Sequence, residues 1–316
     1  MTRVLLPDEV RGLYGEMFCQ GFYTLVDEEH GVARIIEKCI SKGPGEWDVV
    51  NRRRTGGVIE TIRQEANTLV MDTVIGEREL RFGPVDAETG GQGLKALKVE
   101  GDEVRTTWYG IAGATMGIGA CIPQCRDVIR TEYPDDFMIG GAHRAHVDII
   151  TPKLVRLVIG IDDTDTKEKG ASWVTALRLG TTCPIGHFLD HKIIQLNPKA
   201  PNKTTNCCST AVSFAVREEE IPDLIEYARE FVKGESYSDD TVMTVFQGLR
   251  IPQPLQDFGW SCKTVLYKPE DAIKVAEENG VQIISVTGTK GVIGAVAAIG
   301  CFDIGERSAG VPEDFR

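Results

Sequence analysis

Residues 154–166 read LVRLVIGIDDTDT, an apolar run that ends in three carboxylates within four residues. The length of this run and its β-branched side chains predict a buried strand rather than a helix. Asp162, Asp163 and Asp165 then follow the carboxyl end of a strand, where α/β proteins place ligand chemistry. Their hard oxygen ligands suit Mg²⁺, which takes one or two carboxylates and substrate phosphates. An acidic turn that precedes and caps a helix is the competing interpretation.

The composition is that of an ordinary globular protein of 316 residues, long enough for two domains. Nine cysteines in a chain without a visible signal peptide predict reduced thiols rather than a disulfide framework. The sequence contains no run of eighteen apolar residues, so it predicts no membrane span. We therefore expect a cytoplasmic protein that does not contact a membrane. The net charge of −12 argues against a broad basic surface for nucleic acid.

The hydrophobic pattern predicts the α/β (α+β) class, with two domains of mixed sheets and helices packed on them. Residues 1–150 are expected to form an N-terminal α+β domain without an assigned role, and residues 151–316 a second domain. In the first, residues 61–66 have a helical pattern, and a helix is expected to run through Val128. In the second, strands are predicted at 187–196, 209–216, 240–246 and 282–287, and helices at 172–179, 221–233, 270–279 and 292–299.

Three motifs follow one another along the second half of the chain: IGIDDTD at 159–165, LNPKAPNKT at 196–204 and GVIGAVAAIG at 291–300. Their order resembles that of the archaeal isoleucine-tRNA 2-agmatinylcytidine synthetase, over about residues 154–302. That enzyme uses ATP to activate a tRNA cytidine and attach agmatine, so the resemblance implies its ATP-dependent and ferredoxin-like domains here. The organisation of the whole chain resembles the methanogenesis marker protein 11 family, which shares this domain.

The second motif supplies groups that suit a nucleotide phosphate, namely Asn197, Lys203, Thr204 and Thr205. A lysine in a loop bounded by prolines can meet a phosphate as a point charge, although most surface lysines are only solvated. The synthetase pattern continues as Trp-Lys-Thr-Arg-Gly, whereas this chain has Asn202 before the lysine and a second threonine after Thr204. The missing Trp and Arg put base stacking and an additional phosphate contact in doubt.

The third motif begins with Gly288-Thr289-Lys290-Gly291 and continues to Gly294, between a predicted strand and a predicted helix. Backbone amides there could surround a phosphate, and Lys290 would add charge. Close packing of the helix on a sheet explains the glycines equally well. We therefore count Lys290, Gly291 and Gly294 as candidate nucleotide-binding residues because of their place in the motif order.

The segment that follows the acidic loop weakens a direct transfer of the synthetase chemistry. Where the synthetase has Cys-Thr-Thr, with a threonine that accepts phosphate, this chain has Ser172-Trp173-Val174. Autophosphorylation is therefore not carried over, and Ser172 is interpreted as an N-cap.

Cys121-x-x-x-Cys125 and Cys207-Cys208 do not match paired zinc or iron–sulfur spacings. Buried, unreactive thiols are the favoured interpretation, and we expect no stoichiometric iron–sulfur cluster.

One basic cluster, Asn51-Arg52-Arg53-Arg54, interrupts the acidic composition of the N-terminal half. It could hold a phosphate or an acidic partner. We favour a solvated turn for it.

These observations predict an enzyme that uses ATP and Mg²⁺ to transfer a phosphoryl or adenylyl group to an unidentified acceptor, in a pathway linked to methanogenesis. Asp162, Asp163 and Asp165 would hold the metal, and Asp163, Asp165 and Lys203 would act in catalysis. We do not expect tRNA to be the acceptor, because of the net charge and because RNA-binding segments are not visible. The alternative is a non-catalytic accessory or maturation factor of methanogens that binds a nucleotide or a metal and docks on a protein partner.

Overall fold

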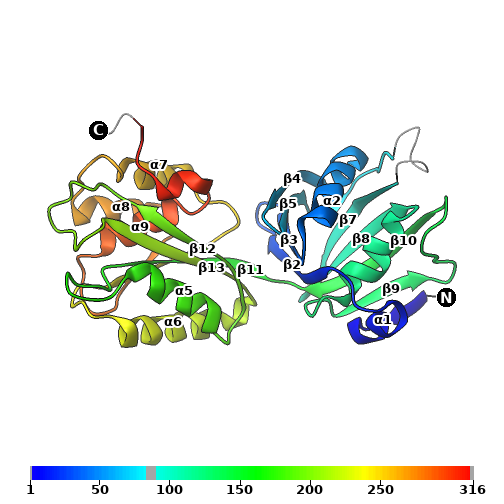
Figure 1. Cartoon of the computed structure of the whole chain (residues 1–316), viewed down its shortest axis with the longest axis horizontal. Coiled ribbons are helices and arrows are strands. Elements are labelled where there is room, and N and C mark those ends of the chain that lie inside the picture. The colour runs from blue at the N-terminus through cyan, green and yellow to red at the C-terminus, as the bar shows by residue number, and fades with distance from the viewer. Residues whose placement is uncertain (1, 83–89, 314–316) are drawn as a thin grey trace. The chain divides into compact units, whose positions relative to one another are not determined.

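The computed structural model describes residues 2–82 and 90–313, which divide into two compact units, residues 1–154 and 155–316. Each unit contains antiparallel sheets with helices packed on them (Figure 1). The predicted α/β (α+β) class is therefore confirmed. Among the described residues, no helix is both long enough and apolar enough to cross a membrane.

The first unit contains two sheets. The larger has the strand order β1-β9-β10-β8-β7-β6, and the smaller has the order β2-β3-β5-β4. The strands of the larger sheet are β1 (Thr2–Leu5), β6 (Gly76–Glu77), β7 (Gly91–Glu100), β8 (Glu103–Ile111), β9 (Arg130–Pro134) and β10 (Arg144–Pro152). Those of the smaller are β2 (Cys19–Asp27), β3 (Val32–Cys39), β4 (Ile59–Glu65) and β5 (Thr68–Val74). One core of buried apolar residues from both sheets, including Phe22, Ile35 and Trp108, stabilises the unit.

The helical segments of the first unit are α1 (Pro7–Tyr14), α2 (Lys42–Thr55), α4 (Ala114–Met116), the π-helix η1 (Gly117–Cys121) and the 3₁₀-helix η2 (Ile122–Gln124). The helix expected to run through Val128 therefore ends at Gln124, after a change of helical type. The helix expected at residues 61–66 is wrong, because these residues belong to β4. Ile62 pairs with Met71 of β5 and is buried, so tertiary pairing overrides the local pattern.

The basic cluster at Arg52 lies on α2 and is not a solvated turn. Arg52 is fully buried and forms ion pairs with Glu37 and Asp48, at 2.7 and 3.0 Å. Arg53 donates to the carbonyl oxygen of Ile62. The sequence pattern misses this arrangement because a buried arginine is stabilised by carboxylates that are distant in sequence.

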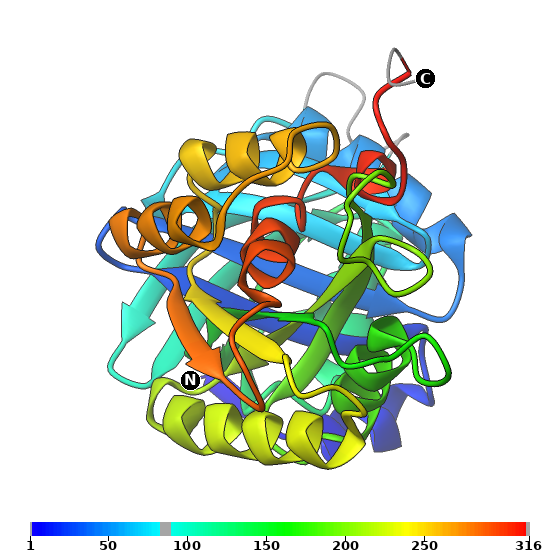
Figure 2. The same cartoon turned by 90° about the vertical axis from the view of Figure 1, so that its left-hand side faces the viewer.

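The second unit is built on one sheet with the order β12-β13-β11-β14-β15, in which every neighbouring pair is antiparallel. Its strands are β11 (Val155–Asp162), β12 (His187–Gln195), β13 (Cys208–Val216), β14 (Val242–Gln247) and β15 (Gln282–Ser285). Helices α5 (Ser172–Thr182) and α6 (Ile221–Glu235) cover one face. Helices α7 (Gln253–Ser261), α8 (Pro269–Glu278) and α9 (Val292–Gly300) cover the other, as Figure 2 shows.

The central strand β11 is buried on both faces, which explains its continuous apolar sequence. Leu157, Ile159 and Ile161 pack into the core beneath α5 and α6. Val158 packs into the core beneath α7, α8 and α9, and Gly160 faces the same way because side chains alternate along a strand. A Cβ atom at Gly160 would overlap the carbonyl oxygen of Ala295 on α9. The absence of a side chain at this position lets the helix backbone approach the strand.

We predict that Gly160→Ala lowers the free energy of unfolding by about 1–3 kcal/mol, because the added methyl group must displace the α9 backbone. Gly234→Ala on α6 is the matched control, since a Cβ atom there meets no atom within 4 Å. Removal of a helical glycine should leave stability unchanged or raise it by up to about 1 kcal/mol. Urea unfolding of both variants measures the difference. Equal stabilities would contradict the close approach of α9 to β11.

Candidate functional site

The alternation of β11 also decides where Asp162 points. It is the last residue of the strand and shares its face with Val158 and Gly160, the face covered by α9. A Cβ atom at Gly294, in the first turn of α9, would overlap the carboxylate of Asp162. Gly294 therefore makes room for the carboxylate at the positive end of the helix, where negative charge is stabilised.

Asp163 begins the loop after the strand in the left-handed backbone region, with φ 57°. Aspartate tolerates this region better than most residues, because its short polar side chain can bond locally. The hydroxyl group of Thr241 donates a hydrogen bond of 2.7 Å to the carbonyl oxygen of Asp163. The loop is thereby fixed to the residue that precedes β14.

The next residues continue this attachment. Buried Thr164 donates hydrogen bonds from its backbone N–H and its hydroxyl group to Oγ of Ser172, at 3.2 and 3.0 Å. Ser172 is the first residue of α5 and follows the N-cap Ala171, so it joins the acidic loop to the helix rather than capping it. Asp165 accepts a hydrogen bond of 3.4 Å from the hydroxyl group of Thr204. The first and second sequence motifs therefore meet at this point.

The three aspartates lie in an environment that disfavours their charged forms. Burial and the charge of Asp163 raise the pKa of Asp162 well above its usual range. Burial, Asp165 and Asp240 raise the pKa of Asp163 to about 6, although Lys290 acts in the opposite direction. Burial also raises the pKa of Asp165. A bound cation would reverse this penalty and favour the carboxylates.

A cavity of about 720 Å³ lies beside these carboxylates. Its walls come from the acidic loop, the proline-bounded loop between β12 and β13, the segment after α7 and the start of α9. The candidate residues among its lining are Asp162, Asp163, Asp165, Asn197, Lys203, Thr204, Lys290 and Gly294. The structure therefore brings together groups from all three sequence motifs.

Two other candidates lie outside this lining, as far as the described residues show. Thr205 does not line the cavity, although its neighbour Thr204 does. Gly291 is the N-cap of α9, and a Cβ atom there would lie 2.9 Å from the carbonyl oxygen of Asp162. Gly291 therefore has a packing role at the site.

Asn197 and Lys203 have partners within their own loop or close to it. The buried Asn197 amide donates to the carbonyl oxygen of Thr264 at 3.0 Å and accepts from the backbone N–H of Lys199 at 2.9 Å. This amide therefore fixes the loop. The exposed Lys203 donates from Nζ to the carbonyl oxygen of Pro198, an interaction that a phosphate could replace.

Sequence reasoning missed Asp240, which lines the cavity and forms an ion pair of 2.6 Å with Lys290. Asp240 precedes β14, and β14 runs antiparallel to β11 with Val242 opposite Asp162. An antiparallel pairing brings the start of one strand to the end of the other. The pairing of β14 with β11, once it is known, predicts that Asp240 lies beside Asp162. The sequence alone does not reveal this pairing.

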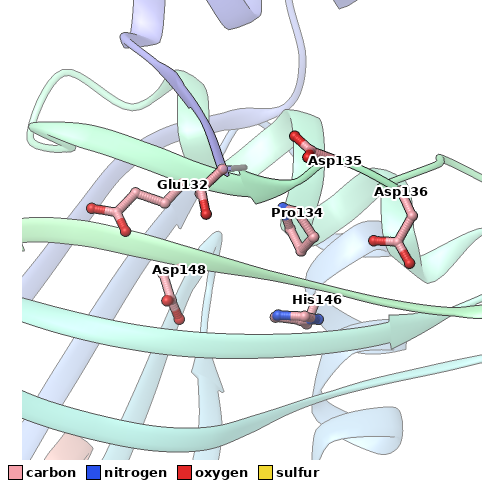
Figure 3. A pocket seen from close by; sticks show the side chains of 7 residues that line it. Glu132, Pro134, Asp135, Asp136, His146 and Asp148 are labelled. Atoms are coloured by element: carbon pink, nitrogen blue, oxygen red, sulfur yellow. The ribbon is translucent and has the colours of Figure 1, made fainter.

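A second cavity, of about 390 Å³, lies in the first unit and is acidic. Figure 3 shows His146 and Asp148 on β10, with Glu132 on the neighbouring strand β9. Arg105 forms ion pairs with Glu132 and Asp148, at 2.8 and 3.2 Å. Glu132 and Asp148 therefore have a cationic partner, whereas Asp162, Asp163 and Asp165 of the larger cavity form no ion pair with a described residue.

Part of the second unit matches a known domain. Residues 158–224 match the model of the TiaS TCKD domain. The 2-agmatinylcytidine synthetase TiaS of Thermococcus sibiricus, named for an isoleucine tRNA, is 36% identical over 152 residues, which are 46% of this chain and 35% of that protein. This chain thus spans about a third of the synthetase's length.

Solved structures give a similar coverage. The crystal structure of TiaS in complex with an isoleucine tRNA and ATP aligns over 46% of this chain and 36% of that chain, with 22% identity and a TM-score of 0.42. The structure of TiaS with the same tRNA, AMPCPP and agmatine gives 21% identity and a TM-score of 0.40.

The expectation that tRNA is an unlikely partner is wrong, because the relatives that match the second unit are named as synthetases of an isoleucine tRNA. The physical reason for the error is that net charge describes the whole chain. A total of −12 limits a broad basic surface but places no limit on one local binding groove.

A longer match covers both units. The uncharacterized protein MJ0921 of Methanocaldococcus jannaschii is 35% identical over 280 residues, which are 87% of this chain and 91% of that protein. The matched length includes the first unit as well as the part related to the synthetases. The chain therefore belongs to the family of MJ0921.

Proposed function

We propose that the second unit is a Mg²⁺-dependent ATP-binding site that transfers a phosphoryl or adenylyl group to a nucleic-acid acceptor of the tRNA class. The observation that carries this proposal is the convergence of Asp162, Asp163 and Asp165 with Lys203 and Lys290 around one cavity. Such transfer requires positioned cations around a polyphosphate and little covalent chemistry from the protein.

The metal would be held by the aspartates. Asp162 is held at the end of β11, with its carboxylate against Gly294. Asp163 is held by the hydrogen bond from the Thr241 hydroxyl group to its carbonyl oxygen. Asp165 is held less firmly, with a long hydrogen bond of 3.4 Å from Thr204. We therefore assign the metal position to Asp162 and Asp163 and give Asp165 the role of completing the shell or orienting the attacking group.

The phosphates would be held by cationic and amide groups. Lys203 would leave the carbonyl oxygen of Pro198, and Lys290 would be shared between Asp240 and a phosphate oxygen. The first turn of α9, which begins after Gly291, would add its positive end. Thr204 would link this phosphate region to Asp165.

The acceptor is proposed from the relatives. The Thermococcus sibiricus and Pyrococcus horikoshii proteins that match the second unit are both named as 2-agmatinylcytidine synthetases of an isoleucine tRNA. The first unit, residues 1–154, lies outside residues 158–224, which match the TiaS TCKD domain. We propose that this unit selects an acceptor within the tRNA class other than the isoleucine tRNA for which those synthetases are named. A cytoplasmic location and a link to methanogenesis, as in the methanogenesis marker protein 11 family, complete the proposal.

A non-catalytic accessory role is the second candidate, favoured by the start of α5. Trp173, 43% exposed, and Val174 stand where the synthetase pattern has its threonines. An exposed tryptophan is typical of protein contacts. Such a factor would bind ATP and Mg²⁺ without cleaving ATP, which the experiments below distinguish.

We predict that Asp162→Asn abolishes the Mg²⁺ dependence of ATP binding, because it removes the carboxylate that β11 and α9 fix in place. Calorimetric titration with ATP, with and without Mg²⁺, measures this effect. Asp257→Asn, on α7 and outside the cavity lining, serves as the matched control and should bind like the wild type. Equal Mg·ATP affinity in the wild type and in Asp162→Asn would remove the metal assignment.

We predict that ATP cleavage accelerates in the presence of archaeal tRNA and that label from ATP appears on the tRNA.

We predict that Lys203→Ala lowers the kcat of ATP cleavage on the order of a hundredfold, with a smaller change in ATP affinity, because the ammonium group would meet charge that grows during transfer. Lys203→Arg should restore only part of the activity, because a planar guanidinium group does not reproduce a point charge.

Lys199→Ala, in the same loop, is the control for the Lys203 variants and should retain wild-type turnover. ATP binding without cleavage, with or without tRNA, would support the accessory role instead. A folded Lys203→Ala protein with unchanged turnover would show that this lysine is only solvated.

We predict that Asp163→Asn makes the stability of the Mg²⁺-free protein less dependent on pH. The pKa of Asp163 in the folded chain, about 6, lies above its ordinary value of 3.8, so the folded state binds more protons between these values. The stabilising contribution is complete below pH 3.8 and disappears as pH rises through about 6. Removal of the charge should therefore raise stability most at neutral pH.

Thermal unfolding from acid to neutral pH, with and without Mg²⁺, measures this effect. Mg²⁺ should stabilise the wild type more at neutral pH than in acid, where the carboxylates are protonated. Asn is also tolerated at a positive φ, so the loop should be retained. If Asp163→Asn were less stable than the wild type at neutral pH without Mg²⁺, the charge of Asp163 in the wild type would already be compensated by other groups.

A further inference from the structure

Two cysteines contact one buried carboxylate in the core of the first unit, and two more cysteines lie in the same core. Cys19 is on β2, Cys39 is on β3, and Cys121 and Cys125 lie at the ends of η1 and η2. Their exposed fractions are 8%, 4%, 0% and 1%. The carboxylate is that of Glu37, which is fully buried.

The strand register explains how this cluster forms. Cys19 lies opposite Cys39 in the β2–β3 pair. Glu37 is two residues before Cys39, and side chains two apart on a strand point to the same face. The segment from Gly117 to Gln124 changes from π-helix to 3₁₀-helix and packs against β2, which brings Cys125 to the same place.

The side chains of Cys19, Cys39 and Glu37 lie close enough together to share a tetrahedral metal ion after small shifts. One oxygen of Glu37 lies 3.1 Å from Sγ of Cys19 and 3.9 Å from Sγ of Cys39. Ligand atoms of the three residues all lie within 4.8 Å of one another. A zinc ion with bonds of about 2.3 Å to sulfur and about 2.1 Å to oxygen separates its ligand atoms by about 3.5–3.8 Å. Cys125 lies outside this group of ligand atoms but close enough to Cys19 to raise the pKa of its thiol, so its side chain would have to move inward to complete the shell.

The surrounding charges also suit a metal. Three thiolates and one carboxylate around Zn²⁺ carry a net charge of about −2. Arg52 donates to the second oxygen of Glu37 at 2.7 Å and supplies a compensating positive charge. An outer partner of this kind fixes the orientation of a metal ligand.

We propose that Cys19, Cys39 and Glu37, with Cys125 as the fourth ligand, form a structural zinc site in the first unit. Soft thiolates select zinc over magnesium or calcium, and a carboxylate ligand favours zinc over copper(I) or an iron–sulfur cluster. Burial of all four ligands leaves no open position for a substrate, so the metal would join β2, β3 and the end of η2. This site is independent of the cavity in the second unit.

Elemental analysis of the purified full-length protein tests the proposal directly, and we expect about one zinc per chain. Protein recovered without zinc should bind about one equivalent of added Zn²⁺ in competition with a chromophoric chelator. Zinc should raise the melting temperature, and the chelator should lower it. Failure to bind added zinc, stoichiometric iron with sulfide, or a Cys19–Cys39 disulfide in the reduced preparation would each overturn the proposal.

Substitution of the ligands identifies the site. Cys39→Ser and Cys125→Ser should lower zinc affinity on the order of tenfold or more. Cys183→Ser is the matched control, because this half-buried thiol lies at the end of α5 in the other unit. Cobalt bound in place of zinc should show thiolate charge-transfer absorption that weakens in Cys39→Ser but not in Cys183→Ser. Equal zinc binding in all three variants would place the metal elsewhere, and the wild-type titration stays decisive if a ligand variant does not fold.

Discussion

The close approach of α9 to the central strand β11 is the constraint on which the second unit depends. It requires glycine at two positions: Gly160, which faces the Ala295 carbonyl oxygen, and Gly294, which faces the Asp162 carboxylate. The hydroxyl group of Thr244 also donates to the Ala295 carbonyl at 2.8 Å, so the helix is held by a buried hydrogen bond as well as by apolar contacts. The same packing that stabilises the sheet positions a carboxylate at the start of a helix. Structure and candidate site therefore share one arrangement of backbone atoms.

The two units treat buried carboxylates in opposite ways. In the first, Glu37 and Asp48 are paired with Arg52, whose guanidinium group also lies over the Trp108 ring at 4.8 Å. In the second, Asp162 and Asp163 form no ion pair with a described residue. Burial raises the pKa values of both, as it also raises that of Asp48 to about 7, so the contrast lies in the missing cationic partner. Uncompensated charge beside a cavity is costly for stability and typical of a position where a ligand supplies the missing partner. This contrast is why we assign the nucleotide site to the second unit.

The sequence predicted β11, its neighbouring elements and the fold class, because buried strands and amphipathic helices have local patterns. The local pattern was not enough at residues 61–66, where pairing with β5 makes a strand, or at Arg52, which is buried by residues from other elements. The convergence of the three motifs could be expected only from their order. Asp240 was missed because its proximity to Asp162 follows from an antiparallel pairing, and no single segment encodes that pairing.

The cysteines show the same limit more strongly. Spacing directed attention to Cys121 and Cys125, which are near in sequence, and favoured unreactive thiols. Cys19 and Cys39 are brought together by the β2–β3 register, and Glu37 joins them because it is two residues from Cys39 on one strand. A ligand set assembled from separate strands leaves no short motif in the sequence. For this reason, spacing alone is a weak argument against metal binding in a chain with several strands and several cysteines.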